Sequence, residues 1–214
     1  MKGGYIMEKD EYYLMLNNSR RRVRDVTTKV KRFMIDKINW EDRLISISGA
    51  RGTGKTTMIL QHIKESFGSD SDVAIYVSLD NLWFKTHSIL ELVEEHYNNG
   101  GTHIFIDEVH YQNDWQLIIK NIYDDHPDLN IVYTGSSLLQ IDYDSGDLSR
   151  RQILYKMPGL SFREYLMFEE IGEWNAVSLQ DILIKHVKIA NSITENIKVL
   201  KHFNAYLENG YYPF

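Results

Sequence analysis

Short apolar runs alternate with amphipathic segments along the first 160 residues of the chain. Runs of apolar and β-branched residues predict five strands, at 43–48, 72–79, 103–107, 130–134 and 151–157. Apolar positions three and four residues apart predict the helices between them, at 55–66, 88–97 and 114–125. Strands that alternate with helices favour a parallel sheet covered on both faces, which is an α/β fold.

Both ends of the chain have a helical pattern instead. Near the N-terminus, apolar residues on one stripe predict a helix that Asn18 or Ser19 caps and that runs to about Asp36. Three further helices are expected after the core, at 161–171, 179–190 and 193–208, and Ser161 with Glu164 forms a capping box at the first of them. We therefore divide the chain into three parts: an N-terminal helical segment (1–38), an α/β core (39–160) and a helical appendage (161–214) that we expect to continue in a longer protein.

Composition narrows the classes of protein to which the chain can belong. Hydrophobic residues make up 43% and charged residues 25%, which is ordinary for a globular protein. The chain has no cysteine, so disulfides, thiolate metal sites and cysteine nucleophiles are excluded. Its apolar runs are far shorter than the roughly 20 residues of a membrane span, and the N-terminus lacks an apolar signal segment. We expect a cytoplasmic protein that does not contact a membrane.

The charge is distributed unevenly. The net charge is −6, but residues 20–37 hold eight basic and two acidic residues, which leaves −12 for the rest of the chain. This basic segment is either a solvated helix face or a local contact for nucleic acid.

Residues Gly49-Ala50-Arg51-Gly52-Thr53-Gly54-Lys55-Thr56 match the pattern G-x-x-x-x-G-K-[ST] between a predicted strand and a predicted helix. Glycines allow the backbone to approach a polyphosphate, and the N–H groups at the helix start form an anion nest. Lys55 is placed to bridge the β- and γ-phosphates, and the Thr56 hydroxyl to bind Mg²⁺. The predicted nucleotide-binding residues are Gly49, Arg51, Gly52, Thr53, Gly54, Lys55, Thr56 and Thr57.

A second motif lies about fifty residues further on, where the apolar strand at 103–107 ends in adjacent acids. Open α/β sheets bind ligands at the carboxyl ends of their strands. We therefore expect Asp107 to hold Mg²⁺ and Glu108 to act as general base on the water that attacks the γ-phosphate.

Two further elements supply candidates for the same reaction. The strand at 130–134 leads into hydroxyl residues, of which Ser136, or alternatively Thr134, could lie between the γ-phosphate and the attacking water. An arginine is needed to neutralise the developing charge, and Arg151 is the candidate, acting in its own site or in that of a neighbouring subunit. The alternative is a surface pair, Arg150 and Arg151, that faces the acidic residues of segment 142–147.

Together these motifs resemble the P-loop ATPases that carry an extra strand between the nucleotide motifs and a glutamate beside the magnesium aspartate, a group that includes the AAA+ ATPases. The resemblance implies a three-layer P-loop NTPase fold with five parallel strands in the order 5-1-4-3-2, and ATP and Mg²⁺ as ligands. A narrower resemblance is to bacterial and archaeal AAA-like ATPases with an uncharacterised, nuclease-like C-terminal half. It rests on Val77–Asp80, Asp107–His110, Tyr133–Ser137 and Leu160–Leu166. It implies that this chain is the N-terminal ATPase part.

The expected function is therefore an ATPase or nucleotide-gated switch coupled to an unknown protein or nucleic-acid partner. A nucleic-acid motor is one alternative, suggested by Asp-Glu-Val-His and the basic segment, although a helicase of that type needs a second motor domain. A small-molecule kinase would need a lid with arginines. A non-catalytic nucleotide-binding scaffold would not need intact Lys55, Thr56, Asp107 and Glu108. The oligomeric state and the choice of ATP over GTP stay open at this point.

Overall fold

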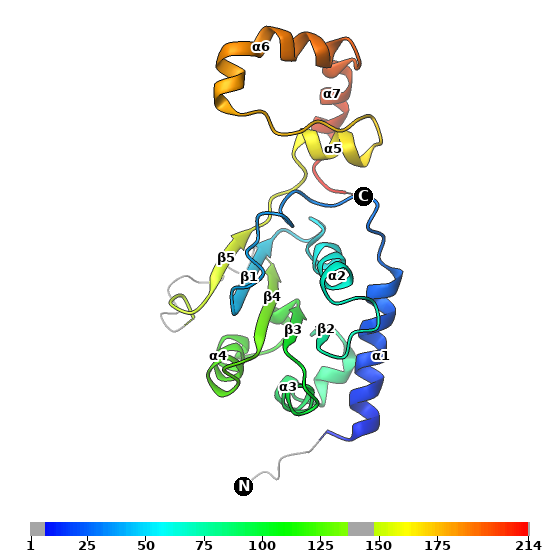
Figure 1. Cartoon of the computed structure of the whole chain (residues 1–214). Helices are drawn as coiled ribbons and strands as arrows, with labels where there is room; N and C mark the ends of the chain where they lie inside the picture. Colours follow the sequence, from blue (N-terminus) through cyan, green and yellow to red (C-terminus); the bar gives the residue numbers. More distant parts are fainter. Residues whose placement is uncertain (1–6, 137–147, 214) are drawn as a thin grey trace. The chain divides into compact units, whose positions relative to one another are not determined.

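The computed structural model describes residues 7–136 and 148–213 (Figure 1). The chain divides into two compact units, Met1–Met157 and Pro158–Phe214. The first unit contains the strands β1 (Leu44–Gly49), β2 (Ala74–Ser78), β3 (His103–Asp107), β4 (Asn130–Ser136) and β5 (Ile153–Lys156). Its helices are α1 (Lys9–Asp25), α2 (Lys55–Ser66), α3 (Ile89–Asn98) and α4 (Trp115–Asp125), with short 3₁₀ turns at Leu82–Lys85 and Val109–Tyr111.

The strands form one parallel sheet in the order β2-β3-β4-β1-β5. This confirms the predicted P-loop NTPase fold and its order 5-1-4-3-2, which is the same sheet read from the other edge. The strand register places Gly49 opposite Ser136 and Ser78 opposite Asp107. The carboxyl ends of β1, β2, β3 and β4 therefore lie at one edge of the sheet.

Alternate residues of each strand face the two helical layers. In β2, Ile75 and Val77 join a core cluster with residues of α3 and α4, whereas Tyr76 joins a second cluster with residues of α2. Phe105 in β3 likewise faces α2, and its neighbour Ile104 faces the other layer. Helices thus cover both faces of the sheet, with α2 opposite α3 and α4 (Figure 1). Each fully buried side chain of this kind contributes about 1.5–3 kcal/mol to the free energy of unfolding.

The N-terminal helix lies earlier in the chain than the sequence pattern indicates. The prediction of a helix from Ser19 to Asp36 was wrong, because α1 ends at Asp25. Its buried stripe is Tyr12, Met15, Leu16, Ser19 and Val23. At the end of α1 and just after it, two side chains of α2 donate hydrogen bonds to backbone carbonyls. Lys64 donates to the carbonyls of Arg24 and Val26 at 2.7 Å. Gln61 donates to those of Thr27 and Val30 at 2.8 and 2.9 Å. The apolar residues of this segment therefore pack against α2 in an irregular conformation.

The second unit contains α5 (Phe162–Phe168), α6 (Leu179–Thr194) and α7 (Val199–Asn209). The capping box predicted at Ser161 and Glu164 is present at the start of α5. Aromatic rings join α5 to α7, with ring centroids 5.2 Å apart for Phe162 and Phe203. In contrast, α6 has no buried residue. Within the described residues, no helix is long and apolar enough to cross a membrane.

Candidate nucleotide site

The loop between β1 and α2 adopts a conformation that requires glycine. Gly52 and Gly54 have φ values of 87° and 92°, which lie in the left-handed region. Gly49 is needed for a different reason, because a Cβ there would lie 2.5 Å from the carbonyl oxygen of Met157 on the neighbouring segment. The spacing of the glycines in the sequence motif therefore follows from backbone geometry and from close approach of two strands.

Lys55 is the first residue of α2, and its side chain is buried beneath the loop. Its Nζ donates to the carbonyls of Gly49 at 2.9 Å and Ala50 at 3.1 Å. Burial lowers the pKa of Lys55, while the nearby Glu108 and Asp107 carboxylates raise it. The ammonium group is therefore held at the loop by carbonyl oxygens, where a phosphate oxygen would be a stronger partner.

The carboxylate of Asp107 is the point at which four segments meet. Its Oδ2 accepts hydrogen bonds from Thr56 Oγ1 at 2.6 Å and from the Tyr76 hydroxyl at 2.8 Å. Its Oδ1 accepts one from Thr134 Oγ1. A threonine hydroxyl beside a carboxylate is a set of hard oxygen donors, which fits Mg²⁺ with its remaining positions filled by water and phosphate. The residues predicted to hold the metal, Thr56 and Asp107, thus lie side by side.

Glu108 follows directly and has an uncommon backbone. Its φ and ψ are 54° and 47°, a left-handed conformation that costs free energy in a residue other than glycine. Its N–H donates to Thr134 Oγ1 at 3.0 Å, so the threonine holds this backbone in place. The Glu108 carboxylate lies 3.3 Å from His110 Nδ1, and about a quarter of each side chain is exposed.

The remaining predicted residues of the loop differ in their surroundings. Arg51 and Thr57 are exposed, whereas Thr53 is fully buried and its hydroxyl donates to the Ala50 carbonyl at 2.9 Å. Ser136 is the register partner of Gly49, so it lies at the start of the P-loop. Ser136 and Thr134 therefore both lie at the predicted edge of the sheet, and Thr134 contacts the acidic pair.

Arg151 lies next to the end of α4 and not beside the acidic pair. It precedes β5, whose residue Ile153 pairs with Ile45 near the amino end of β1. Its guanidinium forms an ion pair with Asp124 at 3.1 Å, near the end of α4. The structure therefore does not bring Arg151 to the P-loop of its own chain, and this placement does not support action in cis. The acidic residues at 142–147, with which a surface pair was considered, fall outside the described residues.

Two residues that contact the site could not be predicted from the sequence. The buried Arg32 donates to the carbonyl of Thr53, and Tyr76 donates to Asp107. Neither residue belongs to a nucleotide motif. Only the strand register, which sets Ser78 opposite Asp107, shows that the Tyr76 hydroxyl can reach the carboxylate.

Comparison with known proteins identifies the family. The AAA domain family matches residues 41–166, which extend from the segment before β1 into α5. The chain belongs to this family. An uncharacterized protein of Methanocaldococcus jannaschii is 28% identical over 194 residues, covering 82% of this chain and 39% of that protein. This AAA domain chain thus spans less than half the length of that relative.

Solved structures of larger proteins are also similar. PCH-2 of C. elegans aligns with a TM-score of 0.41 and 17% identity, over 77% of this chain and 47% of that one. The S. cerevisiae Hsp104–ADP complex aligns with a TM-score of 0.42 and 18% identity, over 78% of this chain and 24% of that one.

The basic segment of the AAA domain chain contacts its own protein. Arg24 pairs with Asp70 at 2.7 Å and Lys31 with Glu65 at 3.1 Å, and Arg20 pairs with Asp72. These acids lie on α2 and in the segment between α2 and β2. Arg20, Arg24 and Lys31 of the basic segment therefore pair with acids of the same unit.

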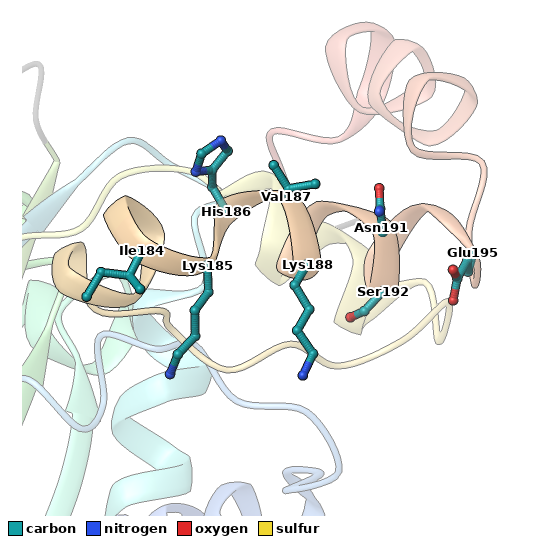
Figure 2. A pocket seen from close by; sticks show the side chains of 8 residues that line it. All are labelled: Ile184, Lys185, His186, Val187, Lys188, Asn191, Ser192 and Glu195. Atoms are coloured by element: carbon teal, nitrogen blue, oxygen red, sulfur yellow. The ribbon is translucent and has the colours of Figure 1, made fainter.

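A hollow of about 660 Å³ lies along α6, outside the matched residues 41–166 (Figure 2). Lys185 and Lys188 point to one side of this helix, away from His186 and Val187. The lining residues, which include His186 and Glu195, all belong to α6 and its C-terminal end. In the part of the chain that the structure describes, no three His, Cys, Asp or Glu side chains gather to hold a metal ion. We assign no catalytic role to this hollow.

Proposed function

We propose that this AAA domain binds ATP with Mg²⁺ and hydrolyses it, and that its nucleotide state is coupled to a partner. The observation that carries the proposal is the 2.6 Å hydrogen bond between Thr56 of the P-loop and Asp107 of β3. It brings the two nucleotide motifs together, and Lys55 and Glu108 are the chain neighbours of these two residues. Family membership supports nucleotide binding at this loop.

Each residue has a distinct task in the proposed reaction. The backbone N–H groups at the start of α2 bind the phosphates at the positive end of the helix, and Lys55 adds a full positive charge. When bound between Thr56 and Asp107, Mg²⁺ would neutralise phosphate charge. Glu108 accepts a proton from the attacking water, a role in general-base catalysis that is worth roughly 10²–10⁴ in rate. Ser136 orients that water or contacts the γ-phosphate.

We assign the proposed partner contact to the helical second unit. The second unit exposes large apolar side chains on α6 and α7, including Leu183 and Leu200, which are 72% and 77% exposed. Apolar surface of this kind is typical of contacts between proteins.

A nucleic-acid motor is the weaker alternative, because basic residues at 20–31 pair with acids of the same unit. A non-catalytic scaffold is disfavoured by the acid pair at 107–108. We place the protein in the cytoplasm, a reducing compartment with which a chain without cysteine is compatible.

Steady-state hydrolysis of ATP in the presence of Mg²⁺ tests the proposal. We expect turnover that is lost in EDTA, and GTP serves as the comparison for base preference. Lys55→Ala should lower ATP affinity or turnover at least about tenfold, because it removes a charge directed at phosphate. Equal affinity and turnover in Lys55→Ala would refute the P-loop site. Repeating the assay with DNA and RNA separates the nucleic-acid alternative, which requires stimulation.

A further inference from the structure

Tyr76 connects the acidic end of β3 to the N-terminal helix. It lies in the edge strand β2, two residues before Ser78, which pairs with Asp107. Tyr76 is the register partner of Phe105, so Tyr76 and Asp107 lie on the same face of the sheet, two residues apart along the strand direction. The buried Tyr76 hydroxyl accordingly donates to Asp107 Oδ2 at 2.8 Å.

Helix α1 contacts Tyr76 at both its backbone and its side chain. Ser19 Oγ accepts the Tyr76 N–H at 2.8 Å, which satisfies a backbone group on the outer edge of the sheet. Arg22 Nη1 donates to the Tyr76 hydroxyl at 3.4 Å, and the guanidinium carbon lies 5.6 Å from the ring centroid. A cavity of about 30 Å³ adjoins Ser19, Arg22 and Tyr76. The contacts of Arg22 with Tyr76 are thus a hydrogen bond to the hydroxyl and a cation–π contact with the ring.

These contacts form a continuous chain of donors that ends on the metal-binding carboxylate. Arg22 donates to the phenol oxygen, and the phenol donates to Asp107. A hydrogen bond that a hydroxyl accepts strengthens the one that it donates. A phenol is protonated at neutral pH, so the Tyr76 hydroxyl acts as the donor to the carboxylate. Unlike Thr56, Tyr76 belongs to no nucleotide motif, and its hydroxyl forms one of the hydrogen bonds to Oδ2 of the Asp107 carboxylate.

We propose that Tyr76 is a positioning residue for Asp107, and that α1, through Arg22, tunes the affinity of the site for Mg²⁺-nucleotide. The inference rests on the proposed function, since it assigns Asp107 to the metal. Because coupling between two sites is reciprocal, Mg²⁺-nucleotide binding would in turn stabilise the docking of α1 on β2.

The test measures binding of a fluorescent ATP analogue in Mg²⁺ and, separately, in EDTA. We expect Tyr76→Phe to weaken the affinity in Mg²⁺ about fivefold or more, the effect of one lost hydrogen bond to a charged group. Its affinity in EDTA should stay within about twofold of the parent's, because no phosphate contact is removed. Tyr12→Phe is the matched control, since it removes a buried hydroxyl of α1 that bonds to His96 and not to Asp107. That control should leave both affinities unchanged.

Arg22→Met tests the link to α1. It should weaken affinity in Mg²⁺ in the same direction, and it should have no further effect in the Tyr76→Phe background, because the two residues act in series. Arg24→Met, which removes a charge paired with Asp70 at the surface, is its control. If circular dichroism shows that Tyr76→Phe does not fold, the affinities of Arg22→Met in Mg²⁺ and in EDTA test the proposal alone.

The outcomes separate this inference from the proposed function. A parent protein that binds no nucleotide overturns both. A parent that binds and hydrolyses Mg²⁺-ATP, together with Tyr76→Phe and Arg22→Met variants of the same Mg²⁺ dependence, overturns only the positioning role. A selective loss of affinity in Mg²⁺, absent from both controls, supports it.

Discussion

Thr134 Oγ1 accepts the backbone N–H of Glu108 at 3.0 Å. The same oxygen donates its proton to the carboxylate of Asp107. One buried hydroxyl on β4 thus contacts both acidic residues at the end of β3. It contacts Asp107 through the carboxylate and Glu108 through the backbone N–H. Glu108 itself has a left-handed backbone conformation, with φ 54° and ψ 47°.

Thr134→Val keeps the shape of the side chain and removes the hydroxyl. We expect ATP turnover to fall about tenfold or more, because the Glu108 backbone loses its partner and the Asp107 carboxylate loses a donor. The free energy of unfolding should fall by about 1–3 kcal/mol, the cost of leaving a buried polar group without a partner. Steady-state kinetics and urea denaturation measure the two effects. Thr102→Val, at an exposed position, is the control, and equal losses in both variants would contradict the account.

The stability of the fold should decrease as the pH falls from about 6.5 to about 4. Burial lowers the pKa of His96 to about 4, and burial together with His103 lowers that of His62 to about 4. The native state therefore keeps these imidazoles neutral over a range in which the unfolded chain binds protons, and protonation favours unfolding. At pH 5 the loss from His96 alone is on the order of 2 kcal/mol relative to pH 7.

Urea denaturation at pH 7 and pH 5 measures this effect. His96→Gln should lower the free energy of unfolding at pH 7, because it disturbs the contact with Tyr12, but it should reduce the difference between the two pH values by up to about 2 kcal/mol. His186→Gln, on the exposed face of α6, is the control. An undiminished pH dependence in His96→Gln would show that His96 is not the titrating group.

Arg151→Ala should leave ATP turnover unchanged at low protein concentration. The side chain pairs with Asp124 near the end of α4, and an exposed pair of this kind contributes about 1 kcal/mol or less to stability. Turnover per molecule is measured over a range of protein concentrations, with Asp124→Asn as the control for loss of the ion pair. A loss of activity that appears only at high concentration in Arg151→Ala would indicate that Arg151 acts in the site of a neighbouring subunit. A loss at every concentration would contradict the placement seen here.

The sequence was sufficient for the parts of the fold that follow from local patterns. The strands are short, apolar and separated by helices, so the parallel sheet and the position of the P-loop could be derived from residue spacing. The C-terminal boundary of α1 could not be derived in this way, because it lies where Lys64 and Gln61 of α2 donate hydrogen bonds to backbone carbonyls of residues 24–30. Those hydrogen bonds are tertiary contacts.

The same distinction applies to the candidate site. Lys55, Thr56, Asp107 and Glu108 could be predicted because their motifs lie next to strand ends that a parallel sheet brings to one edge. Tyr76 could not be predicted, because its role depends on the register between β2 and β3. The sequence also gave no indication that Arg151 lies near the amino end of β1 rather than at the P-loop.

Hydrolysis and binding of ATP in Glu108→Gln test the central claim most directly. The substitution keeps the size of the side chain and removes the base. We predict that turnover falls by roughly 10²–10⁴, the usual worth of general-base catalysis, while Mg²⁺-ATP still binds within a few fold of the parent's affinity. Turnover at the parental rate would contradict the assignment of Glu108 as the base, and with it the account of this site as an ATPase centre.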